Sequence, residues 1–265
     1  MEPDPVPEDI TQHENVEDAT AQDEESLDLA PAFSAQPALY LVATPIGNLA
    51  DITLRGLEVL RRVDAIACED TRHSGRLLQH HGIRSRLISL NEHNEARRIP
   101  ELIAHIEHGG SVALISDAGM PTVSDPGQRL VQSVVAAGLK VEPIPGPSAV
   151  LSALAASGLP TTPFYFGGFL AHKKGQRAKE LLAALQRECT SVYFESPYRL
   201  VDTLGMIAEH APNHRVVVAR ELTKKFEEFR RGPAQNVLLH YQGKAPKGEI
   251  TLVIAPFELP KWITW

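Results

Sequence analysis

Runs of apolar residues alternate with amphipathic segments along residues 38–158, and this alternation is the clearest structural signal in the chain. Short apolar runs are typical of strands covered on both faces, whereas apolar positions three or four residues apart are typical of helices. The runs predict strands at 38–43, 63–67, 86–90, 111–116 and 140–144, and the periodic segments predict helices at 53–62, 95–108, 128–137 and 147–157. Strands that alternate with helices favour an α/β domain with a mainly parallel sheet.

A second α/β unit of similar size follows the first. Its apolar runs predict strands at 164–169, 191–195, 215–219 and 249–255, with helical patterns at 175–188, 198–210 and 233–241. The segment 157–163 contains one glycine and two prolines and is the clearest internal break. We therefore expect one α/β domain at 38–158, a second at 159–256 and a short C-terminal tail at 257–265.

Charge is distributed unevenly along the 265 residues, whose formal net charge is −7. Residues 1–35 contain 11 Asp and Glu and no Lys or Arg; without them, 22 acidic residues face 26 basic ones, a net charge of +4. The acidic, apolar-poor segment 1–37 is therefore predicted to be a disordered tail. No apolar run reaches the length of about 18 residues that a membrane span requires, and the N-terminus lacks a signal-peptide pattern, so we expect a soluble, cytoplasmic protein without a membrane partner.

Four turn-rich loops follow predicted strands, at 44–51, 68–72, 116–127 and 143–149, and all of them except 68–72 contain glycine and proline. Glycine lets the backbone approach a ligand closely, and proline fixes a loop before the ligand binds. Since ligands of open α/β sheets bind beyond the carboxyl ends of the strands, these loops predict a preformed pocket for a small molecule. The alternative is a set of ordinary tight turns. A dinucleotide fingerprint, a P-loop and a nucleophile elbow are all absent from the sequence.

The sequence resembles the tetrapyrrole methylase superfamily and, within it, the 16S ribosomal RNA (cytidine-2′-O)-methyltransferases. The matching segments include TPIGNLADITLR (44–55), CEDTRHSGRLL (68–78), ISDAGMPTVSDPG (115–127), PIPGPSAVLSALAASGLP (143–160), FESPYRL (194–200), RELTKKFEE (220–228) and KGEITLVI (247–254). This resemblance implies two α/β domains of the tetrapyrrole methylase type with the cofactor cleft between them, and a homodimer. It implies S-adenosyl-L-methionine as methyl donor and, as acceptor, the 2′-hydroxyl of a cytidine in 16S ribosomal RNA within the small ribosomal subunit.

The resemblance also assigns residues to the methyl donor. It implies that the donor contacts Pro45, Asp117, Ala118, Gly119, Gly146, Pro147, Ser148, Ala149 and Phe194. A carboxylate such as Asp117 can accept hydrogen bonds from ribose hydroxyls or an ammonium group, and Ser148 begins a predicted helix whose free amides can bind a carboxylate. Loop stabilisation by Asp117 and N-capping by Ser148 are the structural alternatives.

Methyl transfer to a ribose hydroxyl needs positioning and a way for the hydroxyl proton to leave, but no metal. The candidate catalytic residues are Glu69, Asp70 and Arg72 in one loop and Lys224 in another, with Glu221 and Lys225 beside it. Arg72 and Lys224 are expected to face the acceptor ribose from opposite domains, and Lys224 could act as a base if burial lowers its pKa. The alternative is that these charges form an ion-pair network that joins the domains.

Two features depart from the family pattern. They are the acidic N-terminal tail and the short segment 256–265, which does not resemble the small helical segment that members commonly carry at this point. Two other functions also stay open. One is methylation of a tetrapyrrole or another non-RNA acceptor, and the other is that of a non-catalytic RNA-binding factor in ribosome assembly.

Overall fold

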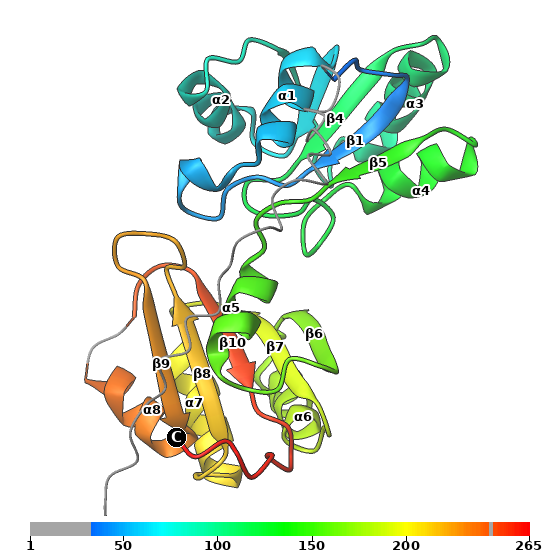
Figure 1. Ribbon diagram of the computed structural model, residues 1–265. Helices are drawn as coiled ribbons and strands as arrows, with labels where there is room; N and C mark the ends of the chain where they lie inside the picture. The colour runs from blue at the N-terminus through cyan, green and yellow to red at the C-terminus, as the bar shows by residue number, and fades with distance from the viewer. Residues whose placement is uncertain (1–32, 244–245) are drawn as a thin grey trace, which may run out of the picture. The chain divides into compact units, whose positions relative to one another are not determined.

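The computed structural model describes residues 33–243 and 246–265, which form two five-stranded sheets with helices packed on them (Figure 1). Most of the predicted tail at 1–37 lies outside the described residues. Of its described part, Gln36 is fixed to the first strand, because its backbone N donates to Tyr40 Oη (2.9 Å). No helix within the described ranges is long and apolar enough to cross a membrane.

The first sheet has the strand order β3-β2-β4-β1-β5, and every pair in it is parallel, as predicted. Its strands are β1 (Ala38–Val42), β2 (Ala65–Cys68), β3 (Arg86–Ser89), β4 (Ser111–Ile115) and β5 (Val141–Ile144). Its helices are α1 (Leu54–Arg62), α2 (Thr71–His80), α3 (Glu95–Glu107) and α4 (Gln128–Ala136), with a 3-10 turn, η1, at Leu49–Asp51. Because all five strands run in one direction, their carboxyl ends lie on the same edge of the sheet.

The apolar runs of the first unit form its core. Leu39 of β1 and Val112 of β4 are fully buried and pack with Leu102, Ile106 and Leu130 of the covering helices. Two of the helices begin at polar caps, since the side chain of Thr53 accepts from Gly56 N before α1 and that of Asp70 accepts from Arg72 N before α2. A sheet buried on both faces requires such continuous apolar strands.

The second sheet has the order β6-β7-β10-β8-β9 and is mixed. Only β6 and β7 are parallel; β10 is antiparallel to both of its neighbours, and β9 is antiparallel to β8. The strands are β6 (Phe164–Phe169), β7 (Thr190–Glu195), β8 (Arg215–Arg220), β9 (Glu228–Pro233) and β10 (Ile250–Ile254), and the helices are α5 (Ala149–Ser157), α6 (Lys174–Leu185), α7 (Leu200–His210) and α8 (Ala234–Gln242). The sequence pattern missed β9, because this edge strand is polar and only partly buried.

Helix α5 packs on the second sheet although it precedes residue 158, where we expect the domain boundary. Its residues Val150 and Leu154 join Val192, Val217 and Val253 in one apolar cluster. The C-terminal residues Ile263 and Trp265 pack against the same cluster without forming a helix or strand. The domain limits themselves stay a prediction.

Candidate functional site

The loops after β1 and β4 are joined to each other directly. Thr44 and Gly119 form an antiparallel bridge with two backbone hydrogen bonds of 2.9 Å, and Thr44 Oγ1 donates to Ser116 O (3.0 Å). Gly119 has a φ of +84°, which an L-residue with a side chain rarely adopts. Two of the glycine- and proline-rich loops are thus fixed together at the carboxyl edge of the first sheet.

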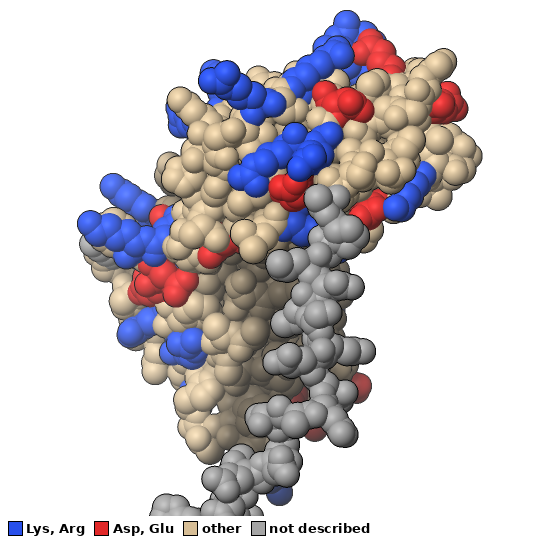
Figure 2. All heavy atoms as spheres, turned by 45° about the horizontal axis from the view of Figure 1, so that its top comes forward, with Lys and Arg blue, Asp and Glu red and all other residues tan. Residues whose placement is uncertain are grey.

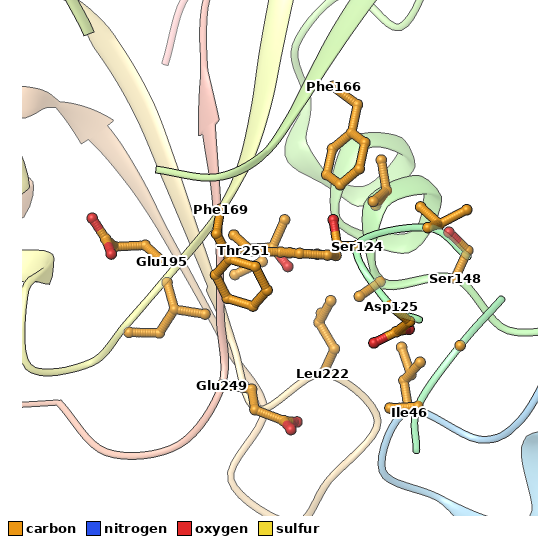
Figure 3. Close-up of a pocket in the computed structure, with 18 of the residues that line it drawn as sticks. Ile46, Ser124, Asp125, Ser148, Phe166, Phe169, Glu195, Leu222, Glu249 and Thr251 are labelled. Carbon is orange, nitrogen blue, oxygen red and sulfur yellow. The ribbon is translucent and has the colours of Figure 1, made fainter. Parts of the chain in front are cut away.

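A cavity of about 700 Å³ opens beside these loops (Figure 3). In the close-up, Ser124, Asp125 and Ser148 lie on one side, and Phe169, Glu195 and Glu249 on the other. The lining is apolar except for a few polar groups. Its ionisable residues are five carboxylates and no Lys, Arg or His: Glu69, Asp117, Asp125, Glu195 and Glu249. Such a lining suits a ligand that combines an apolar body with positive charge.

The cavity contains seven of the residues singled out from the sequence, namely Glu69, Asp117, Ala118, Gly119, Ser148, Ala149 and Phe194. Gly146 and Pro147 line a second, smaller hollow of about 290 Å³, which shares Ile46 with the first. Pro45 is buried next to Ile46 and lines neither. Asp70, Arg72 and Lys224 are also outside both linings.

Asp117 and Ser148 can each bind the donor or have a structural role, and their surroundings bear on both possibilities. Asp117 Oδ1 is buried without a hydrogen-bond partner in the structure, so this oxygen can accept from a ligand. Ser148 caps helix α5, since its Oγ accepts from Leu151 N (3.4 Å), and it also lines the cavity. Capping therefore accounts for Ser148 but leaves its other side open to a ligand.

Aromatic rings form the apolar wall of the cavity. The ring of Phe194 on β7 lies 5.2 Å from the ring of Phe166 and 5.2 Å from that of Phe169, measured between centroids. The exposed fraction of Phe169 is 60%, although its ring belongs to the lining. Exposed aromatic surface of this kind can pack against a planar heterocycle such as an adenine.

Glu195 is a lining residue whose carboxylate is already satisfied. It accepts from Arg199 Nη2 (2.7 Å), Thr203 Oγ1 (2.5 Å) and its neighbour's backbone, Ser196 N (2.7 Å). Its side chain has no exposed surface. This network fixes the end of β7 beside the cavity and neutralises the charge of the carboxylate.

The catalytic candidates of the first unit are paired with each other. Asp70 accepts from Arg72 Nε (3.3 Å) and Nη2 (3.1 Å), and the side chain of Arg72 is 88% exposed. The hydrogen bonds from Arg72 lower the pKa of Asp70 to about 2, so Asp70 is a poor proton acceptor. Burial raises the pKa of the neighbouring Glu69, and the nearby carboxylates of Asp117, Glu92 and Asp70 raise it further.

Lys224 stands in a similar local pair in the second unit. Its Nζ lies 2.9 Å from Glu221 Oε1 and 2.6 Å from Glu249 Oε2. Burial by itself lowers the pKa of Lys224, but the hydrogen bonds to Glu249 and Glu221 outweigh it and the pKa is raised. The condition under which Lys224 could act as a base, a lowered pKa, is therefore not met. The pairs around Arg72 and Lys224 are each local, so they do not support the alternative of an ion-pair network that joins the domains.

Backbone strain is concentrated in two loops of the site. Among the described residues, the non-glycine residues with positive φ are Thr122 (74°), Ser124 (67°), Glu221 (52°) and Thr223 (65°). The first two flank Val123 and the last two flank Leu222, and both of these apolar residues line the cavity. Residues in such conformations persist only where the surrounding structure requires them, and they are concentrated at functional sites.

Sequence reasoning assigned no role to several residues of the lining. Asp125, Glu195, Glu249, Phe166 and Phe169 contribute to it, although the motifs SDPG, FESP and KGEI contain the three acids. The motif letters did not show which side chains face the cavity. Within residues 33–243 and 246–265, no group of three or more His, Cys, Asp or Glu side chains could hold a metal ion.

Known proteins resemble this chain in sequence and in fold. The family profile of the Tetrapyrrole (Corrin/Porphyrin) Methylases matches residues 38–238. The chain belongs to this family. The tetrapyrrole methylase is 53% identical over 230 residues to the "Ribosomal RNA small subunit methyltransferase I" of Mesorhizobium japonicum, with 86% of this chain and 78% of that protein covered. It is 46% identical over 218 residues to the protein of the same name from Thermotoga maritima, with 82% and 97% covered.

Solved structures of other proteins have the same fold. A uroporphyrin-III-C-methyltransferase from Thermus thermophilus superposes with a TM-score of 0.58 at 24% identity, covering 85% of this tetrapyrrole methylase and all of that chain. A diphthine synthase superposes with a TM-score of 0.65 at 17% identity, covering 82% and 90%. The predicted fold class, two α/β units of the tetrapyrrole methylase type, is confirmed, and the second sheet is mixed rather than parallel.

Proposed function

We propose that this methyltransferase binds S-adenosyl-L-methionine in the 700 Å³ cavity. The observation that best supports this proposal is the cavity lining, in which apolar and aromatic surface surrounds carboxylates without any basic side chain. A sulfonium and an ammonium group are both positively charged, and the adenine and ribose need apolar surface and hydrogen-bond acceptors. Asp117 Oδ1 is a buried acceptor without a partner, and Asp117, Ala118, Gly119, Ser148, Ala149 and Phe194 are placed to hold the donor. When bound, S-adenosyl-L-methionine supplies the methyl group.

The proposed acceptor is the 2′-hydroxyl of a cytidine in 16S ribosomal RNA, presented by the small ribosomal subunit. The support is the high identity to relatives that are named ribosomal RNA small subunit methyltransferase I. The charge of the chain beyond residue 35 is +4, and Figure 2 shows several groups of Lys and Arg side chains on one face, with Asp and Glu beside them. Such exposed cations can bind phosphates, while the acidic cavity receives the cationic donor.

Arg72 and Lys224 are proposed to hold the phosphates that flank the target nucleotide. Both are outside the cavity lining, and Arg72 is largely exposed, as a phosphate contact requires. The pair with Asp70 orients the Arg72 guanidinium, and the carboxylates of Glu221 and Glu249 orient Lys224. We further infer, from the family resemblance, a homodimer that acts in the cytoplasm; sedimentation equilibrium tests the dimer.

The competing acceptor is a tetrapyrrole, because the cavity is roomy and partly aromatic. Natural tetrapyrroles carry several carboxylate side chains, however, and these carboxylates would meet Glu69, Asp117 and Asp125, which no ion pair among the described residues neutralises. The lining therefore disfavours a tetrapyrrole, and the names of the relatives support RNA.

A tritium-transfer assay with S-adenosyl-L-methionine tests the proposal. We expect incorporation into small subunits that lack the modification, at a higher rate than into naked 16S RNA, and none into a uroporphyrinogen. Ribose methylation protects the adjacent phosphodiester from alkaline cleavage, so a single protected site would identify the nucleotide. Calorimetry with the donor alone separates an enzyme from a non-catalytic assembly factor, which need not bind it. Methyl transfer to a tetrapyrrole, or no donor binding, would contradict the proposal.

A further inference from the structure

Asp125 is a cavity residue that no step of the proposed function uses. It belongs to the loop between β4 and α4, directly after Ser124, whose φ is positive, and two residues before Gly127, whose φ is +112°. A Cβ added at Gly127 would lie 2.6 Å from Leu114 Cδ2, so the loop does not accept a larger residue at this position unless neighbouring atoms shift. In Figure 3 the Asp125 carboxylate lies among Ile46, Ser148 and Leu222, inside the cavity.

The surroundings of Asp125 make its carboxylate a stronger base than an ordinary aspartate. Burial raises its pKa to about 6, with a further contribution from the negative charges of Glu69 and Asp117, and a hydrogen bond from Ser116 opposes the rise. Two of the other four lining carboxylates, Glu195 and Glu249, are paired with Arg199 and Lys224. No ion pair among the described residues neutralises Asp125, and no basic side chain lines the cavity.

The catalytic candidates identified from the sequence are less suited than Asp125 to take up a proton at neutral pH. Asp70 is bound to Arg72 and is too weak a base, and Lys224 stays protonated in its pair with two glutamates. Glu69 is exposed at the rim, whereas Asp125 is half-buried in the lining. A group whose pKa lies just below the operating pH is mostly ionised and still basic enough to accept a proton efficiently.

We propose that Asp125 is the proton acceptor for the ribose hydroxyl that receives the methyl group. This inference rests on the proposed methyl transfer. The ribose oxygen forms a bond to the methyl carbon while the carbon–sulfur bond breaks, and the electron pair of that bond stays on sulfur. The hydroxyl proton passes to a carboxylate oxygen of Asp125 and leaves to water after the product departs. No metal or further reactant is needed for this balance.

The first readout of the test does not depend on catalysis. Near pH 6, Asp125 is about half protonated, and a bound cation favours the ionised carboxylate. Binding of S-adenosyl-L-methionine to the wild-type chain should therefore release up to about a quarter of a proton when Asp125 changes the donor affinity less than threefold, measured by calorimetry in buffers with different ionisation enthalpies. In Asp125→Asn this release should largely disappear, while Glu101→Gln, which removes one exposed charge on α3 outside both cavity linings, should keep it.

The second readout is single-turnover methyl transfer to small subunits. Loss of a general base lowers the rate by about 10²- to 10⁴-fold, so we expect at least a hundredfold loss in Asp125→Asn with donor affinity changed less than threefold. Asp125→Glu should recover part of the rate, and Glu101→Gln all of it. In the wild type, kcat/KM for the donor should fall as pH decreases through about 6, and this fall should be absent from the residual activity of Asp125→Asn.

Three results would overturn the inference. The first is an Asp125→Asn variant that keeps more than a third of the rate. The second is a variant whose donor affinity falls more than tenfold while the rate with saturating donor is unchanged, because Asp125 would then be a counter-ion of the donor. The third is an Asp125→Asn variant that releases as many protons on donor binding as the wild type does. A wild-type chain that transfers no methyl to small subunits would instead contradict the proposed function, and the two failures are thereby distinguished.

Discussion

Replacing Asp125 by asparagine should stabilise the donor-free protein above pH 6, because the fold holds this carboxylate where its charge is unfavourable. The pKa of Asp125 is raised from its ordinary value of 3.8 to about 6 by burial and by Glu69 and Asp117. Between these two pH values, the folded chain holds more protons at this site than the unfolded chain. Stability contributed by this group is therefore lost as pH rises through that window, and the full penalty applies above it.

The size of the effect follows from the pKa shift. A shift from 3.8 to about 6 corresponds to at most about 3 kcal/mol, and solvent screening of a half-exposed carboxylate reduces this to about 1–1.5 kcal/mol. For a chain of this length, that gain is equivalent to a rise of about 2–6 °C in Tm. Calorimetric or circular dichroism melts of the donor-free wild type and Asp125→Asn should differ by this amount at pH 8 and converge near pH 4.

Glu101→Gln is the matched control for this experiment. Its carboxylate is exposed, and the hydrogen bond from Arg98 lowers rather than raises its pKa, so its removal should not stabilise the protein at pH 8. If Asp125→Asn melts at the same temperature as the wild type at pH 8, or below it, Asp125 is not a destabilised carboxylate. The electrostatic reasoning that supports its role in proton transfer would then be refuted.

Further substitutions test the rest of the site. Asp117→Ala should weaken donor binding about ten- to a hundredfold by calorimetry, because the acceptor Asp117 Oδ1 is lost; unchanged affinity would remove this loop from the donor site. Arg72→Ala and Lys224→Ala should each lower methyl transfer to small subunits at least tenfold at constant donor affinity, and full activity of both would show that these charges are only structural. Gly127→Ala should destabilise the chain by about 1–3 kcal/mol in urea unfolding, because φ is +112° and the new Cβ would meet Leu114, and a stability equal to the wild type would show that this loop is not constrained.

The sequence by itself determined most of the secondary structure and the parallel first sheet. Continuous apolar runs such as that of β4 can only be buried between two layers, and alternation with helices forces the strands into parallel crossovers. Particular elements were not predicted from the sequence. Strand β9 has the polar sequence EFRRGP, and it forms because β8 offers a free edge with which it can pair, which no pattern within β9 records. In the same way, the second sheet is mixed because β10 lies between β7 and β8 and is antiparallel to both.

For the candidate site too, the sequence identified one part and only the tertiary structure showed the rest. The motifs identified the loops, and the structure places Asp117, Ala118, Gly119, Ser148, Ala149 and Phe194 around one cavity. Only the tertiary structure separated the acids by environment. Asp70 is paired with an arginine, Glu195 with an arginine and a threonine, and Asp125 with neither, and the pKa of Asp70 is lowered whereas that of Asp125 is raised. The base strength of a carboxylate depends on burial and on the charges that surround it in space, and chain segments far apart in the sequence supply both.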